Sequence, residues 1–170
     1  GHNIVLSYQY NYGKTGRNMT NDYFDFYNYS PLQNHRNEVT TPSNEHTIQL
    51  DYVNPFSQMH ILETGAKYIN RRSDNYSHYF MDNAGTFEQD FNRSVDLQQY
   101  QDVAALYASY SFNYKQFGFN AGLRYEHTRM GVNFMSDGYE AFSTTLDDLV
   151  PSAMVSYRLG VAGMLRLNYN

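Results

Sequence analysis

The sequence predicts an all-β protein, an antiparallel up-and-down meander of about seven strands that forms part of a transmembrane β-barrel. Three observations predict this fold. Apolar and polar residues alternate with a period of two over segments about ten residues long. The connections between these segments alternate between very short turns and long polar stretches. Aromatic residues make up 17% of the chain, with 18 Tyr and 11 Phe, which suits strands and the aromatic girdles of membrane barrels.

The alternation is most regular in a hairpin formed by residues 103–114 and 117–126. In the first segment the even-numbered residues from Ala104 to Tyr114 are apolar or aromatic, and Tyr107, Ser109, Ser111 and Asn113 form the other face. After a short turn, the odd-numbered residues of the second segment are apolar or aromatic. Successive side chains of a strand point to opposite faces, so each segment has one apolar wall and one polar wall.

Five further segments show the same alternation and complete the meander. They are residues 3–12, 46–53, 59–71, 149–159 and 164–170. Long loops are expected between the paired segments, at about 13–43, 72–102 and 131–148. Short turns of such barrels face the periplasm and long loops face the outside of the cell, so this pattern also predicts the direction of the strands.

A single domain is expected over residues 1–170. Gly1-His2 resembles a cloning remnant, and a strand is predicted almost from the first residue. The sequence is therefore expected to be an excised internal piece of a larger barrel.

Composition excludes several other classes of protein. A net charge of −5 and a pI near 5.6 disfavour nucleic acid as a partner, because its binders carry a basic patch. The chain has no Cys, which rules out disulfides and thiolate metal sites within it. No run approaches the roughly 18 apolar residues of a membrane helix.

Several segments of the sequence resemble those of a known family. They are His46-Thr47-Ile48-Gln49-Leu50-Asp51-Tyr52, Leu62-Glu63-Thr64-Gly65-Ala66-Lys67-Tyr68, Ala121-Gly122-Leu123-Arg124-Tyr125-Glu126 and Leu149-Val150-Pro151-Ser152. The chain resembles the barrel region of TonB-dependent outer-membrane receptors, in the outer-membrane β-barrel family of gut-type Gram-negative bacteria. The resemblance implies location in the outer membrane, contact with its lipid, and a complete barrel of about 22 strands. It also implies a plug domain and TonB as partners, and an unknown nutrient as ligand.

Residue patterns for catalysis or metal binding are absent from the sequence. Glu126 and His127 are neighbours on a strand, so their side chains are expected on opposite faces and cannot share a metal ion. Asp147-Asp148 lacks the spaced oxygen ligands of a calcium site. Neither a nucleophile elbow nor a phosphate-binding loop is present. We therefore expect no catalytic residue, no metal, no cofactor and no enzymatic activity.

Two sets of residues are candidates for functional contacts. Polar residues predicted to face the barrel lumen are Glu63, Lys67, Arg124, Glu126 and Arg158. They could contact a plug or a passing substrate. The favoured interpretation is that they form charged pairs across neighbouring strands, which keep this face of the barrel wall hydrated. Candidate ligand-contact residues in the long polar stretches are Tyr23, Phe24, Phe26, Tyr27, Tyr29, Tyr76, Tyr79 and Phe80. These aromatic residues either bind a ligand or pack the loops together.

The sequence favours a part of the barrel wall and external loops of an outer-membrane receptor that imports a nutrient. The alternative is a soluble all-β module that binds a ligand such as a carbohydrate. Exposed strand edges and apolar stripes also predict that the isolated chain associates with itself or closes on itself in water.

Overall fold

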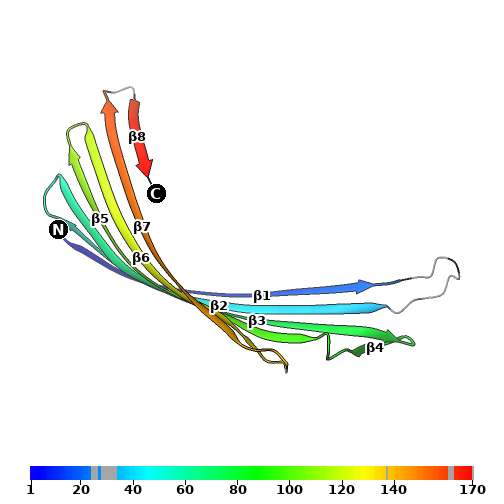
Figure 1. Ribbon diagram of the computed structural model, residues 1–170. Coiled ribbons are helices and arrows are strands. Elements are labelled where there is room, and N and C mark those ends of the chain that lie inside the picture. Colours follow the sequence, from blue (N-terminus) through cyan, green and yellow to red (C-terminus); the bar gives the residue numbers. More distant parts are fainter. Residues whose placement is uncertain (24–26, 28–33, 137, 161–162, 170) are drawn as a thin grey trace.

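The protein forms one curved antiparallel sheet (Figure 1). The computed structural model describes residues 1–23, 27, 34–136, 138–160 and 163–169. The strands are β1 (Asn3–Asn21), β2 (His35–Pro55), β3 (His60–Asn83), β4 (Thr86–Gln89), β5 (Val95–Tyr114), β6 (Phe117–Phe134), β7 (Phe142–Leu159) and β8 (Gly163–Tyr169). Seven of them pair in the order β1-β2-β3-β5-β6-β7-β8, and the short strand β4 pairs with the end of β3. The predicted all-β meander is confirmed.

The strands are longer than the sequence predicted. β3 has 24 residues and β2 has 21. At about 3.3 Å per residue, β3 is roughly 80 Å long, whereas the hydrocarbon core of a membrane is about 30 Å thick. The sheet therefore has a part that can cross a membrane and a part that extends well beyond it.

The predicted boundaries of the three long loops are wrong. Most of residues 13–43, 72–102 and 131–148 lie in strands, as the far ends of β1 and β2, β3 and β5, and β6 and β7. In these extensions both faces carry polar residues, as in Ser73-Asp74-Asn75. Alternation of apolar and polar residues is then absent, although cross-strand hydrogen bonds still pair the backbones.

Short turns connect the other ends of the strands. The β5–β6 turn is Lys115-Gln116, in which Lys115 has a φ of 51°. A positive φ in a two-residue turn matches the right-handed twist of the paired strands. Within the described residues the chain contains no helix that could cross a membrane.

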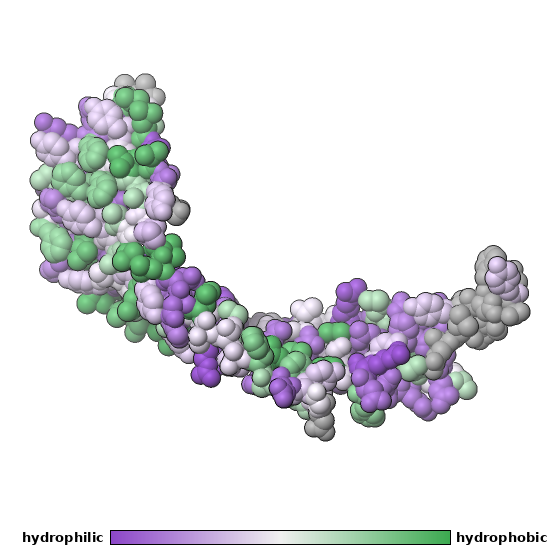
Figure 2. All heavy atoms as spheres, in the orientation of Figure 1, coloured by the Kyte–Doolittle hydropathy of each residue, from purple (hydrophilic) through white to green (hydrophobic). Residues whose placement is uncertain are grey.

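A buried core is almost absent from this single-layered sheet. Among the described apolar residues, only Val103 and Ala105 are buried, at 4% and 3% exposure. Leu6 and Leu167 are 71% and 76% exposed. Figure 2 shows the apolar residues concentrated on the arm of the sheet that holds the two termini, and hydrophilic residues on the other arm. The apolar arm needs a covering that the sheet itself does not supply.

Candidate functional site

The two faces of the sheet differ in polarity. Two neighbouring rows of paired residues, each of which runs across the strands, show this difference. Directly paired residues of antiparallel strands share a face. One row across six strands is entirely apolar or aromatic: Leu6, Leu50, Ala66, Leu106, Tyr125 and Leu149. The adjacent row, on the opposite face, is Val5, Asp51, Gly65, Tyr107, Arg124 and Val150. We call these sides of the sheet the apolar face and the polar face.

The apolar face carries a band that slopes across the strands. Its upper edge, which is the edge next to the strand extensions, lies at Tyr12 on β1 and at Leu149 on β7. The row of paired residues that begins at Tyr12 reaches β7 at Ser143, so the edge shifts by six residues over five strand-to-strand steps. With strands about 4.8 Å apart and a rise of about 3.3 Å per residue, this shift corresponds to a tilt of about 40°. Strands of transmembrane barrels are tilted by about 35–45°.

On the polar face, side-chain hydrogen bonds around Tyr107 join β5 to β2 across the intervening strand β3. The Tyr107 hydroxyl donates to the carboxylate of Asp51. Gln49 donates to the Tyr107 oxygen at 3.2 Å and to Asp51 at 2.9 Å. Because all of these groups lie on one face and are hydrogen-bonded to one another, this face presents a polar surface suited to water.

The five predicted lumen-facing residues all lie on the polar face. Arg124 forms an ion pair with Glu126, two residues along the same strand, at 2.7 Å. Glu63 accepts a hydrogen bond from Ser109 at 3.3 Å. In the described part of the chain, the side chains of Lys67 and Arg158 form no hydrogen bond or ion pair. That this face borders a barrel lumen stays a prediction.

Two glycines allow tyrosine rings to lie flat on the sheet. Gly65 pairs with Tyr107 on the polar face, and Gly131 pairs with Tyr100 on the apolar face. A Cβ on Gly65 would overlap the Tyr107 ring, and a Cβ on Gly131 would lie 2.5 Å from the Tyr100 hydroxyl. Each glycine therefore provides the space for its cross-strand tyrosine.

Charged side chains pair in the extensions beyond the apolar band. Arg72 forms two hydrogen bonds with Asp102, both at 3.1 Å. Partial burial raises the pKa of Asp102, but hydrogen bonds from Arg72 and Asn70 outweigh burial and hold it below its ordinary value. On the opposite face Arg71 donates to Glu45, and this hydrogen bond lowers the pKa of Glu45. Both carboxyls thus remain charged and paired to lower pH than free ones.

Those of the predicted ligand-contact residues that the structure describes do not form one cluster. The ring of His35 stacks between Tyr23 and Tyr79, at 5.3 and 5.2 Å. Tyr76 and Phe80 lie on the apolar face of β3, opposite to Tyr79. Tyr27 is 91% exposed. Phe24, Phe26 and Tyr29 lie outside the described residues.

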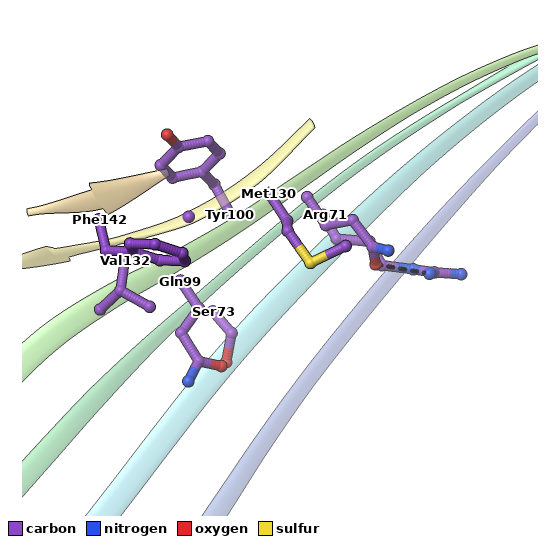
Figure 3. Close-up of a pocket in the computed structure, with 9 residues that line it drawn as sticks. Arg71, Ser73, Gln99, Tyr100, Met130, Val132 and Phe142 are labelled. Atoms are coloured by element: carbon purple, nitrogen blue, oxygen red, sulfur yellow. Dashed lines mark hydrogen bonds between the residues drawn. The ribbon is translucent and has the colours of Figure 1, made fainter. Parts of the chain in front are cut away.

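A groove of about 390 Å³ lies on the polar face above the band, and no pattern in the sequence indicates it. Met130, Val132 and Phe142 form its apolar part, and Arg71 and Gln99 contribute polar groups. In Figure 3, Gln99 and Val132 extend to one side of the sheet, and Tyr100 extends to the other. The groove can hold an apolar group next to hydrogen-bonding side chains.

Histidine and carboxylate side chains are arranged in pairs rather than metal clusters. His127 bonds Asp147 at 2.7 Å on the apolar face, while Glu126 lies on the polar face. Among the described residues, no group of three or more His, Asp or Glu is placed to hold a metal ion.

Comparisons with known proteins give both a family and similar folds. The model of the outer membrane protein beta-barrel family matches residues 1–170. The ferric-catecholate import receptor Fiu from E. coli K12, in its closed form, has a TM-score of 0.67 at 13% identity, with 98% of this chain covered. The ferric citrate transporter FecA has a TM-score of 0.56 at 15% identity, with 98% covered. The ferric yersiniabactin uptake receptor FyuA from Yersinia pestis has a TM-score of 0.55 at 11% identity, with 94% of this chain covered. No curated protein matches the chain.

The chain spans about a quarter to a third of these solved structures. It covers 30% of Fiu, 27% of FecA and 23% of FyuA. At these identities the likeness shows a shared fold.

Proposed function

Because the chain belongs to the outer membrane protein beta-barrel family, we propose that it forms part of the wall of a TonB-dependent receptor. The complete protein would import a nutrient across the outer membrane of a Gram-negative bacterium, with a plug domain inside the barrel and TonB as the source of energy. The solved structures with a similar fold are described as a transporter and import or uptake receptors, which supports transport rather than catalysis.

The sloping apolar band carries this proposal. It lies on one face only, its tilt of about 40° is that of barrel strands in membranes, and a polar face lies behind it. In the membrane, lipid would cover the band and water or a plug would contact the polar face. The isolated chain lacks lipid, and we expect it to bury the band by associating with itself or by closing on itself.

The soluble binding module is the weaker alternative. A soluble protein gains nothing from a broad exposed apolar face, since monomers rarely expose large apolar patches. Membership of an outer-membrane family also favours the barrel wall.

Cysteine scanning along β5 tests the assignment of the two faces. The 170 residues contain no Cys, so each introduced thiol is the only one in this segment. In the full-length protein in outer membranes, we expect Leu106→Cys and Ala108→Cys to react with a lipid-soluble maleimide. We expect Tyr107→Cys and Ser109→Cys to react instead with a small water-soluble maleimide that enters the lumen. Uniform labelling of all four positions by the water-soluble reagent would contradict the proposal.

Recognition of the nutrient is proposed for the aromatic groups at the far ends of the hairpins. The nutrient is identified as the compound that a strain with the gene depletes from the growth medium faster than a strain without it. We expect Tyr23→Ala combined with Tyr27→Ala to slow its depletion more than Tyr157→Ala does, because binding residues concentrate at such ends. Loss of TonB should stop depletion. The reverse ranking of the tyrosine variants would place recognition elsewhere.

A further inference from the structure

A cluster of charged and aromatic side chains lies on the apolar face just above the band. Arg72 pairs directly with Tyr100, and Asp102 pairs directly with Arg129, so all four side chains share this face. Arg72 and Arg129 lie four residues beyond Tyr68 and Tyr125, the last aromatic residues of the band on β3 and β6. With the strands tilted by about 40°, four residues correspond to about 10 Å along the membrane normal. The cluster therefore lies at the headgroup layer or just above it.

The two guanidinium groups contact one tyrosine ring. The Cζ atoms of Arg72 and Arg129 lie 5.4 and 5.9 Å from the centre of the Tyr100 ring. The ring is held in place because it lies over Gly131. Stacking on an aromatic ring orients a guanidinium group without using its hydrogen-bond donors.

The two arginines differ in their remaining partners. Arg72 is held by two hydrogen bonds to Asp102, which also accepts one from Asn70 at 2.6 Å. Arg129 is exposed, and in the part of the chain that the structure describes its side chain forms neither a hydrogen bond nor an ion pair. Arg72 and Asp102 neutralise each other, and the nearby Asp147 is hydrogen-bonded to Tyr125 and His127, so Arg129 is the cation of the cluster whose donors are free.

We propose that this cluster binds a phosphate group of a lipid in the outer leaflet, with Arg129 as the direct ligand. This inference rests on the assignment of the apolar face to lipid under the proposed function. The site continues the lipid-facing band, and phosphate is the anion that lipid headgroups present at this level. Guanidinium groups bind phosphate through paired N–H donors. Arg72 and Tyr100 form the wall that positions the Arg129 guanidinium.

Native mass spectrometry of the full-length protein in detergent tests the site, with lipid A and dephosphorylated lipid A as the probes. We expect the wild-type protein to bind phosphorylated lipid A about fivefold more tightly than the dephosphorylated form. Arg129→Gln should remove most of this preference, and Arg129→Lys should keep part of it because the charge remains. Arg17→Gln is the matched control, since Arg17 is an exposed arginine on the polar face. It should leave the preference unchanged.

Three outcomes would overturn the assignment. The first is an equal affinity of the wild-type protein for the two lipids, and the second is a full preference retained by Arg129→Gln. The third is loss of the preference in millimolar inorganic phosphate, because free phosphate would then account for the site. Heat-modifiable migration of each variant in gels reports barrel folding separately. Folded barrels without lipid preference would contradict this inference alone, whereas chains that never enter a membrane would contradict the proposed function as well.

Discussion

Arginine in place of Ala108 should destabilise the folded barrel by about 2–4 kcal/mol, and arginine in place of Ser109 should cost far less. Ala108 lies on the apolar face between Thr64 and Leu123. An arginine there must either enter lipid or bend away from it. Ser109 lies on the polar face and donates a hydrogen bond to Glu63, so an arginine at this position gains a carboxylate partner.

Reversible unfolding of the full-length protein in lipid vesicles by guanidinium measures the difference. The two substitutions are adjacent in sequence and introduce the same charged side chain, so the main difference between them is the face of the sheet on which the arginine lies. Equal losses of unfolding free energy at the two positions would show that the faces are wrongly assigned.

Alanine in place of Gly131 should destabilise the barrel by about 1–3 kcal/mol, as overpacking does. The added Cβ would lie 2.5 Å from the backbone oxygen of Phe142 and 2.5 Å from the Tyr100 hydroxyl. The tyrosine ring can swing aside, but the backbone of β7 is fixed by its pairing with β6. Gly131→Ala therefore requires the two strands to shift.

Gly13 provides the matched control for this substitution. It also lies within a strand, but an added Cβ would meet only the Ser43 Oγ, at 3.4 Å. Gly13→Ala should be neutral or slightly stabilising, because alanine restricts the unfolded chain more than glycine does. In the same unfolding assay, Tyr100→Ala should rescue Gly131→Ala only in part, since the clash with Phe142 remains. Full rescue would show that the tyrosine alone requires the glycine.

The sequence predicted the part of the fold with the apolar band well. There the two faces of the sheet have different surroundings, which select apolar residues on one face and polar residues on the other. In the proposed barrel wall, lipid on one side and water on the other require the alternation from Ala104 to Tyr114, and the structure pairs this segment as predicted. In that proposal the extensions have water on both sides, so Asp74 and Ser73 are equally suitable on either face. Nothing in the pattern then separates a strand from a loop, and the predicted loops were too long for this reason.

The candidate site could be predicted only in part because it depends on pairing between strands. The two-residue alternation of side chains along a strand predicted that Glu63 and Arg124 lie on one face, and the structure confirms that they share it. The same rule separates Tyr79 from Tyr76 and Phe80, but only once their segment is known to be a strand. The contact of Arg129 with Tyr100 requires the register of β5 and β6, which one sequence does not contain.

The slope of the apolar band also limits how wide the complete barrel can be. A shift of six residues over five steps, continued around a closed barrel, gives a shear number slightly larger than the number of strands. Strand number and shear together determine the radius of a barrel. With about 22 strands, such a barrel is roughly 40 Å across between opposite backbones. A lumen of that width is far too large for side chains to fill, which gives the plug domain of the proposed receptor its task of keeping the outer membrane a barrier.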